Sequence, residues 1–204
     1  CYNISGDRNI FHVRGSSTHL ANKKLKKLRC RSLYFRLYYF YGGFMSFVLC
    51  FIKESYFIDH AYFVKMLDSG NTNKQSQRTH LCLKFTYNSN TFYIPLRNNL
   101  GPEIRKYGRI GHSLPSPSRP NAGLDFRHAL VINSLDYIEP QTIQKIPNSQ
   151  YNKLQDDISD IEKEFKTYLM GFIKAIKKNR IHREPLFRES SLINFVSELN
   201  DSHL

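Results

Sequence analysis

The segment from Phe92 to Phe126 restricts the fold of this 204-residue chain more than any other. It begins as a predicted strand, which Pro95 interrupts. It then continues as a long polar stretch up to Gly123-Leu124-Asp125-Phe126. A second apolar strand, Ala129–Ile132, is expected soon after it. Loops of this length inside a compact domain are uncommon and are either functional or disordered. The loop contains one acidic residue, Glu103, against six Arg, Lys and His residues, which suits phosphate binding. These six are Arg97, Arg105, Lys106, Arg109, His112 and Arg119.

Apolar periodicity predicts short strands and a helix before this segment. Phe47–Ile52 is an apolar run of strand length. A helix is expected across Tyr56–Leu67 because its apolar residues recur on one helical face. The polar run Asn71–Gln77 is then predicted to be a loop.

A β-hairpin is predicted to lead into the basic loop. Leu81, Leu83 and Phe85 alternate with polar residues, as in a half-buried strand. Asn88-Ser89-Asn90 supplies a turn, and the second strand follows it. Pro95 is expected to end hydrogen-bonded pairing, since proline has no backbone N–H.

The C-terminal part of the chain is predicted to be helical. Apolar residues keep three-to-four spacing from Leu154 to Lys178, with acidic residues in the first half and basic residues at the end, an order that complements the helix dipole. Ser190 or Ser191 is expected to cap a short last helix that runs through Leu199. Short strands combined with C-terminal helices indicate an α+β domain.

Composition narrows the class of partner. The chain carries 30 Lys+Arg against 17 Asp+Glu, a formal net charge of +13, and its pI is near 9.6. Such a balance favours an acidic partner, either nucleic acid or an anionic membrane surface. The hydrophobic content of 41% is sufficient for a core and excludes a chain that is disordered throughout.

Residues 1–44 differ from the rest of the chain. They hold nine Lys/Arg against one Asp, show no sustained helical or strand period, and precede the first methionine, Met45. Gly42-Gly43 is compatible with the codons of a ribosome-binding site, and residues 27–33 with those of a terminator hairpin. The hypothesis is that residues 1–44 are a translated upstream leader outside the fold, and that residues 45–204 form a single domain.

A competing interpretation makes Tyr34–Ile52 a membrane anchor. Its length suits a bilayer span, but Arg36 and Gly42-Gly43 interrupt it. The four cysteines are scattered and form no CxxC pair, which fits a reducing cytosol. We therefore expect a cytoplasmic protein without a membrane partner, and the anchor remains an alternative.

Two ordered landmarks carry a resemblance to a known family. The first is Phe92-Tyr93-Ile94-Pro95-Leu96-Arg97-Asn98-Asn99, at the end of the hairpin, and the second is Gly123-Leu124-Asp125-Phe126 with the strand after it. Over about residues 45–180 the chain resembles the endoribonuclease toxins of type III toxin–antitoxin systems, the ToxN/AbiQ and TenpN group. Members usually have Ser or Thr just after the Pro-Leu turn, where this chain has Arg97-Asn98-Asn99.

The resemblance implies a fold, an activity and partners. The implied fold is a compact, partly closed antiparallel β-barrel of the Kid/MazF kind, with one helix near the start and two C-terminal helices. The implied activity is metal-independent cleavage of RNA, without a cofactor, to a 2′,3′-cyclic phosphate. The implied partners are messenger RNA as substrate and a small repeated RNA antitoxin, in a closed ring of protein and RNA. Because this chain lacks the Ser or Thr that family members usually have after Pro-Leu, a non-catalytic RNA- or DNA-binding module remains an alternative.

Cleavage through the 2′-hydroxyl requires proton transfer and donors for the charge that builds on the phosphate. Arg97 is the candidate for holding the phosphate, and Asn98 and Asn99 are candidate oxyanion donors. His112 is the candidate acid or base, because the ordinary pKa of histidine lies near neutral pH. Asp125 is expected to cap a turn or pair with an arginine. Each of these residues also has an ordinary loop role as its alternative.

A further set is expected to contact RNA rather than to take part in the chemistry. The set combines phosphate-binding groups with aromatic rings that stack on bases. It consists of Tyr62, Lys65, Lys106, Tyr107, Arg109, Ser113 and Arg119. No metal site is expected, since His80, His128 and His182 lie in different predicted elements.

Overall fold

The computed structural model describes residues 47–87, 89–104 and 110–200, which belong to one compact unit spanning residues 44–204. The proposed leader, residues 1–44, lies outside the described residues. So does most of the candidate membrane span, whose last residues, Phe47–Ile52, form a β-strand. Within the described part of the chain, no helix combines the length and the apolar character that crossing a bilayer requires.

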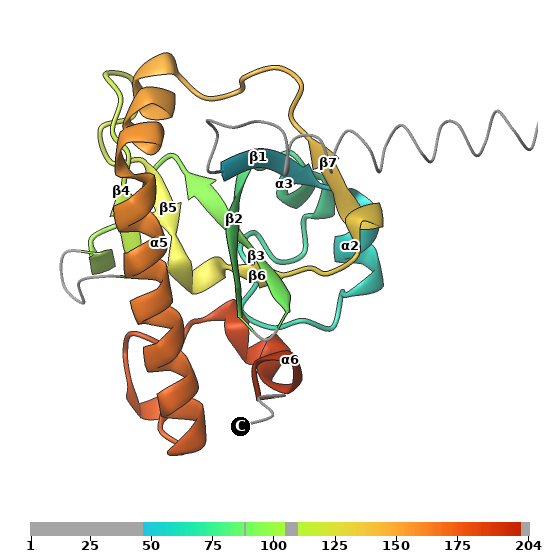
Figure 1. Ribbon diagram of the computed structural model, residues 1–204. Helices are drawn as coiled ribbons and strands as arrows, with labels where there is room; N and C mark the ends of the chain where they lie inside the picture. Colours follow the sequence, from blue (N-terminus) through green and yellow to red (C-terminus); the bar gives the residue numbers. More distant parts are fainter. Residues whose placement is uncertain (1–46, 88, 105–109, 201–204) are drawn as a thin grey trace, which may run out of the picture. The chain divides into compact units, whose positions relative to one another are not determined.

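Seven strands in the described part of the chain form one antiparallel sheet in the order β4-β5-β3-β2-β1-β7, with β6 also paired to β3 (Figure 1). Their bounds are β1 Phe47–Ile52, β2 His80–Tyr87, β3 Asn90–Arg97, β4 Gly111–Ser113, β5 Gly123–Asp125, β6 Leu130–Val131 and β7 Ile138–Pro140. The predicted α+β class and the antiparallel sheet are confirmed. The sheet formed by these residues is open, with β4 and β7 as its outer strands.

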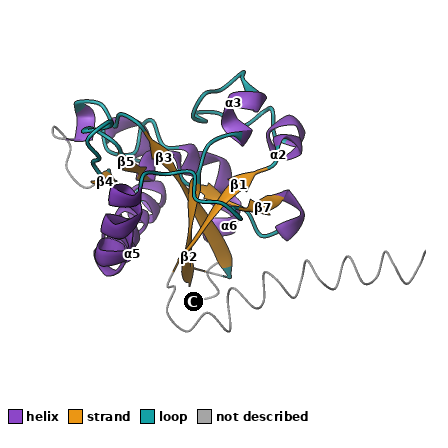
Figure 2. Ribbon diagram, turned by 90° about the horizontal axis from the view of Figure 1, so that it is seen from above, coloured by secondary structure: helices purple, strands orange, loops and turns teal. Residues whose placement is uncertain are grey.

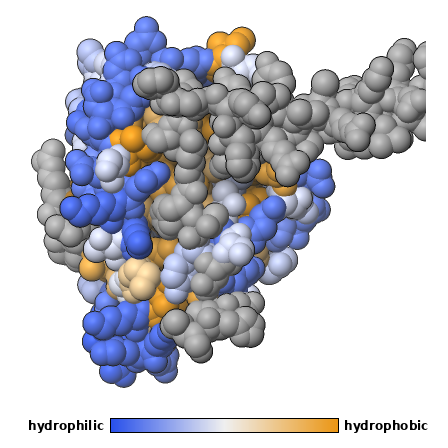
Figure 3. Space-filling view, in the orientation of Figure 1, coloured by the Kyte–Doolittle hydropathy of each residue, from blue (hydrophilic) through white to orange (hydrophobic). Residues whose placement is uncertain are grey.

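Helices flank the two ends of this sheet. The α-helices are α2 Glu54–Asp59, α3 Thr72–Ser76, α5 Asn148–Lys177 and α6 Val196–Asn200. Short 3-10 turns are η1 Phe126–His128, η2 Leu135–Tyr137, η3 Ile181–Arg183 and η4 Ser191–Phe195. Figure 2 shows α5 on one side of the sheet and α2 and α3 on the other. In Figure 3 hydrophilic residues cover the outward side of α5.

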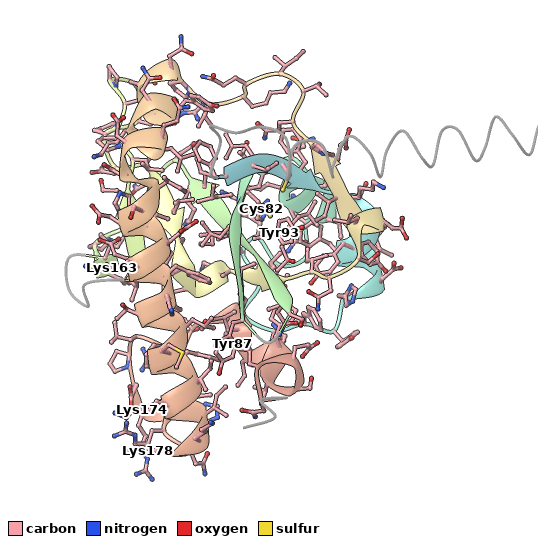
Figure 4. The ribbon with its side chains drawn as sticks, in the orientation of Figure 1. Cys82, Tyr87, Tyr93, Lys163, Lys174 and Lys178 are labelled. Atoms are coloured by element: carbon pink, nitrogen blue, oxygen red, sulfur yellow. The ribbon has the colours of Figure 1, made fainter. Side chains whose placement is uncertain are left out.

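The long helix α5 supplies much of the core and agrees with its prediction. Phe165 lies in its buried stripe and packs edge-on against Phe92, with ring centroids 5.4 Å apart, and against Phe126, at 5.5 Å. The two ends of the Phe92–Phe126 segment therefore meet on one helical residue. Lys174 and Lys178, at the end of α5, point away from the sheet (Figure 4).

The helix predicted across Tyr56–Leu67 is wrong in extent. The α2 helix ends at Asp59, and turns follow it. Further along the predicted span, the Asn194 amide accepts a hydrogen bond from Val64 N at 2.9 Å and donates one to Val64 O at 2.8 Å. These bonds occupy the backbone groups that a continued helix would use. Lys65 then adopts a φ of 58°, which is incompatible with a right-handed helix.

The segment Asn71–Gln77, predicted to be a loop, contains the helix α3. The Asn71 side chain accepts a hydrogen bond from Lys74 N at 2.9 Å and caps the helix. Two short helices thus stand near the start, where one was expected. The predicted last helix is confirmed as η4 followed by α6.

The prediction that Pro95 ends hydrogen-bonded strand pairing is wrong. The strand β3 continues to Arg97, and Leu96 N donates to Thr79 O at 2.9 Å. On the other side of β3, residues 92–93 pair with β6 and residues 96–97 with β5. Pro95 lies in the gap between those two pairings, where the ladder needs no N–H donor.

The long segment after β3 is partly ordered by pairing. Gly111–Ser113 forms β4 and pairs with β5, whereas an irregular loop was expected throughout. The predicted strand Ala129–Ile132 is present over Leu130–Val131. The connector after it also contributes β7, which pairs with β1.

Candidate functional site

A cleft of about 830 Å³ opens where β1, β3 and β7 meet the α3 region and the connector before α5. Figure 1 shows β1, β7 and α3 close together at that end of the sheet. Six basic residues line the cleft against two acidic ones, Glu54 and Glu139. The six are Lys53, Lys74, Arg78, Arg97, Arg119 and Lys145. The cleft therefore offers a positive field to an anionic ligand.

Arg97 lies at the last position of β3 and is held there by Asp125. Arg97 Nη1 donates to Asp125 Oδ2 at 2.6 Å, and the side chain remains 27% exposed. Its Nε and Nη2 atoms have no partner among the described residues. An anchored guanidinium with free donors is a suitable group for binding phosphate.

Asp125 is buried at the end of β5 and organises this corner. One of its oxygens accepts from Arg127 N and Nε, and the other from Arg127 Nη2 at 2.8 Å. It thus both caps η1 and pairs with arginines, as predicted. Burial pushes the pKa of this carboxyl up, but the hydrogen bonds from Arg127 and Arg97 outweigh burial and lower it.

Arg78 is fixed on the same side of the cleft by a different carboxylate. Its Nη1 donates to Leu96 O at 3.0 Å, and its Nη2 pairs with Asp68. Lys74 also contacts Asp68, at 2.6 Å. Burial would raise the pKa of Asp68, but the hydrogen bonds from Lys74 and Arg78 lower it. Two basic lining residues are thus held in place by one carboxylate.

The two candidate asparagines have different positions. Asn98 lines the cleft next to Arg97. Asn99 Oδ1 instead accepts a hydrogen bond from Gly101 N at 2.9 Å. Asn99 therefore has the ordinary turn role that was expected from the sequence as its alternative. Only Asn98 of the pair is therefore positioned to contact a ligand in the cleft.

His112 lies on β4 and faces the helix α5. Its Nδ1 is 2.8 Å from Glu164 Oε2, and its Nε2 is 2.9 Å from Asp157 Oδ2. A carboxylate oxygen lies within hydrogen-bond distance of each ring nitrogen, so neither nitrogen is open to a substrate. Hydrogen bonds from Lys153 and His112 lower the pKa of Asp157. The structure places His112 outside the set that lines the cleft.

The predicted RNA contacts are dispersed. Arg119 lines the cleft. Tyr62 and Lys65 follow α2; Tyr62 is 74% exposed, and Lys65 pairs with Glu189 at 2.8 Å. Ser113 is exposed on β4. The remaining three, Lys106, Tyr107 and Arg109, lie outside the described residues.

Sequence reasoning missed four of the basic residues that line the cleft, Lys53, Lys74, Arg78 and Lys145. A signal for two of them was present. Because β2 pairs antiparallel with both β1 and β3, the end of β1, the start of β2 and the end of β3 lie side by side. Lys53, Arg78 and Arg97 stand just at those three strand ends, so the predicted strands already implied that the three residues would be close together.

No group of three or more His, Cys, Asp or Glu side chains suited to a metal ion occurs among the described residues. Comparison with known proteins found no matching family model, curated protein or solved structure.

Proposed function

We propose that the cleft binds the sugar-phosphate backbone of RNA and that the protein is a metal-independent endoribonuclease of the type III toxin kind. The observation that carries the proposal is the cleft itself, where basic side chains gather around Arg97 and fixed carboxylates hold two of the arginines in place. Phosphate neutralisation by such groups supplies most of the non-specific affinity for nucleic acid. The choice of RNA and of cleavage rests on the resemblance of the Pro95-Leu96-Arg97 turn and the Gly123–Phe126 entry.

The reaction needs little from the protein beyond positioning, charge and proton transfer. The ribose 2′-oxygen attacks the adjacent phosphorus, the bond to the 5′-oxygen breaks, and a 2′,3′-cyclic phosphate remains. The free nitrogens of Arg97 would meet the negative charge that grows on the phosphate oxygens. Asn98, which also lines the cleft, supplies a neutral donor. Arg78 and Lys145 would hold the flanking phosphates.

The same basic surface would bind the inhibitory partner. A small repeated RNA antitoxin presents the phosphates that the substrate presents, so it would occupy the cleft and exclude messenger RNA. The closed ring of protein and RNA and the partly closed barrel implied by the resemblance belong to this proposal.

Cleavage of RNA by the purified 204-residue chain in EDTA tests the proposal. We expect internal cuts whose 5′ fragments end in a 2′,3′-cyclic phosphate, detected by mass spectrometry. The change Arg97→Gln should lower the cleavage rate about 10²- to 10³-fold, the size of effect seen when one transition-state donor is lost. Arg183→Gln is the matched control, because Arg183 is exposed on η3 and does not line the cleft.

Two outcomes would count against the activity. Binding of RNA without cleavage would favour the non-catalytic RNA- or DNA-binding module. Equal cleavage rates in Arg97→Gln and Arg183→Gln would show that the cleft is not the site of cleavage. Thermal unfolding of both variants must accompany the assay, because Arg97 also neutralises the buried Asp125.

A further inference from the structure

His128 lies at the end of η1, beside the carboxylate that anchors Arg97. Its Nε2 is 3.9 Å from Asp125 Oδ2, the oxygen to which Arg97 Nη1 donates at 2.6 Å. The ring is 16% exposed. Arg78, which lines the cleft, also lines a small hollow beside His128. His128 Nε2 and Arg97 Nη1 thus lie near the same carboxylate oxygen, although His128 lines the hollow and is not among the residues that line the cleft.

The hydrogen bond on the other side of the ring determines the tautomer. His128 Nδ1 lies 3.1 Å from the backbone carbonyl oxygen of Lys65. A carbonyl oxygen only accepts, so Nδ1 carries the hydrogen. In the neutral ring Nε2 is therefore the nitrogen with the free lone pair. That nitrogen faces the corner occupied by Arg97 and Asp125.

Burial is the main cause that lowers the pKa of His128 and favours the neutral ring. The charges of Arg127 and Arg97 act in the same direction. Asp125 and the bond to Lys65 O oppose them, but the net pKa remains below the ordinary value of 6.5. The ring is thus unprotonated at neutral pH, as a general base must be.

Neither of the other two histidines near this part of the sheet offers an available nitrogen. Both nitrogens of His112 are engaged by carboxylates. His80 is buried, its Nδ1 bonds to Arg78 O, and burial lowers its pKa to about 3. His128 alone of the three combines partial exposure with a free ring nitrogen.

We infer that His128 Nε2 is the general base for RNA cleavage, acting on the 2′-hydroxyl next to a phosphate held by Arg97. The inference rests on the proposed function. The 2′-hydroxyl proton passes to Nε2 as the bond from the 2′-oxygen to phosphorus forms. The bond from phosphorus to the 5′-oxygen then breaks, and water supplies the proton that the 5′-oxygen takes. The imidazolium finally returns its proton to solvent.

The variant His128→Asn separates catalysis from structure. The Asn amide nitrogen replaces Nδ1 and retains the donor to Lys65 O, while nothing replaces Nε2. We expect cleavage to fall about 10²- to 10⁴-fold, the usual contribution of a positioned base. Binding of a 2′-deoxy oligonucleotide and the unfolding temperature should stay close to wild type. His182→Asn, an exposed histidine on η3, is the matched control.

Two further readouts distinguish a base from a merely structural residue. The cleavage rate of the wild-type protein should rise with pH through a midpoint below 6.5 and then become constant. This rise should be absent in His128→Asn. In His128→Ala, added imidazole should restore part of the rate, because it fits the vacated space and supplies the missing base.

The outcomes separate this inference from the proposed function. Suppose that the wild-type protein cleaves RNA and that His128→Asn either keeps full activity or keeps the same rise of the cleavage rate with pH. Either result would overturn the inference and leave the endoribonuclease proposal standing. Absence of cleavage by the wild-type protein would overturn both. Loss of cleavage in His128→Asn with intact binding, together with imidazole rescue of His128→Ala, would support both.

Discussion

At the scale of single residues, the candidate site is organised by one buried carboxylate. Asp125 receives hydrogen bonds from Arg97 and Arg127 and lies beside His128. Removing one partner from a buried charge pair leaves the other charges uncompensated, and this typically costs several kcal/mol. Asp125 therefore matters for the stability of the domain as well as for the position of Arg97.

We predict that Asp125→Asn destabilises the protein by about 3 kcal/mol and flattens its acid unfolding profile. The pKa of Asp125 is lowered below the ordinary value of 3.8, so its stabilising contribution is full above that value. The contribution is lost as pH falls through the folded-state pKa. Urea unfolding between pH 2 and 6, with pH values chosen around the ordinary carboxyl range, measures this slope. The exposed Asp160→Asn serves as control, and an identical acid slope in Asp125→Asn and wild type would contradict the prediction.

At the scale of elements, α5 joins the two ends of the basic segment. Phe165 contacts Phe92 on β3 and Phe126 just after β5, so one helical position connects strands that are far apart in sequence. Close packing of this kind means that deletion of a ring leaves a cavity that the surroundings fill only in part. The position of Arg97 relative to Asp125 depends on the same strands.

We predict that Phe165→Ala lowers the free energy of unfolding by about 4 kcal/mol, within the range measured for buried Phe→Ala changes. Met170→Ala, on the exposed side of α5, should change it by less than about 0.5 kcal/mol. Equilibrium urea denaturation followed by far-ultraviolet circular dichroism gives both values. A loss below about 1 kcal/mol in Phe165→Ala would show that α5 is not a major part of the core.

At the scale of the whole molecule, the excess of basic residues has a location as well as a magnitude. The chain has a net charge of +13, and six basic residues of the described part gather in one cleft. Others, such as Lys163 and Lys174, lie along the outward side of α5 (Figure 4). If RNA binds in the cleft, only charges that line the cleft should enter the salt dependence of binding.

We predict that Lys145→Gln reduces the slope of log affinity against log salt concentration by about 0.7 for single-stranded RNA, the value for one phosphate contact. Lys163→Gln should leave the slope unchanged. Fluorescence anisotropy with a labelled oligonucleotide at several salt concentrations measures both. Equal slopes in the two variants would place the RNA elsewhere on the surface.

The sequence by itself determined the features that depend on neighbours along the chain. These are the apolar stripe of α5, the hairpin of β2 and β3, the last helix, and the segment that carries Arg97 and Asp125. Tertiary structure decided the rest, because the deciding contacts join distant residues. Asn194 binds both backbone groups of Val64, within the span predicted to be helical up to Leu67, and carboxylates of α5 contact both ring nitrogens of His112. Our proposal of His128 in place of His112 as the base also rests on tertiary contacts, since the two histidines differ in their tertiary partners and not in any local pattern.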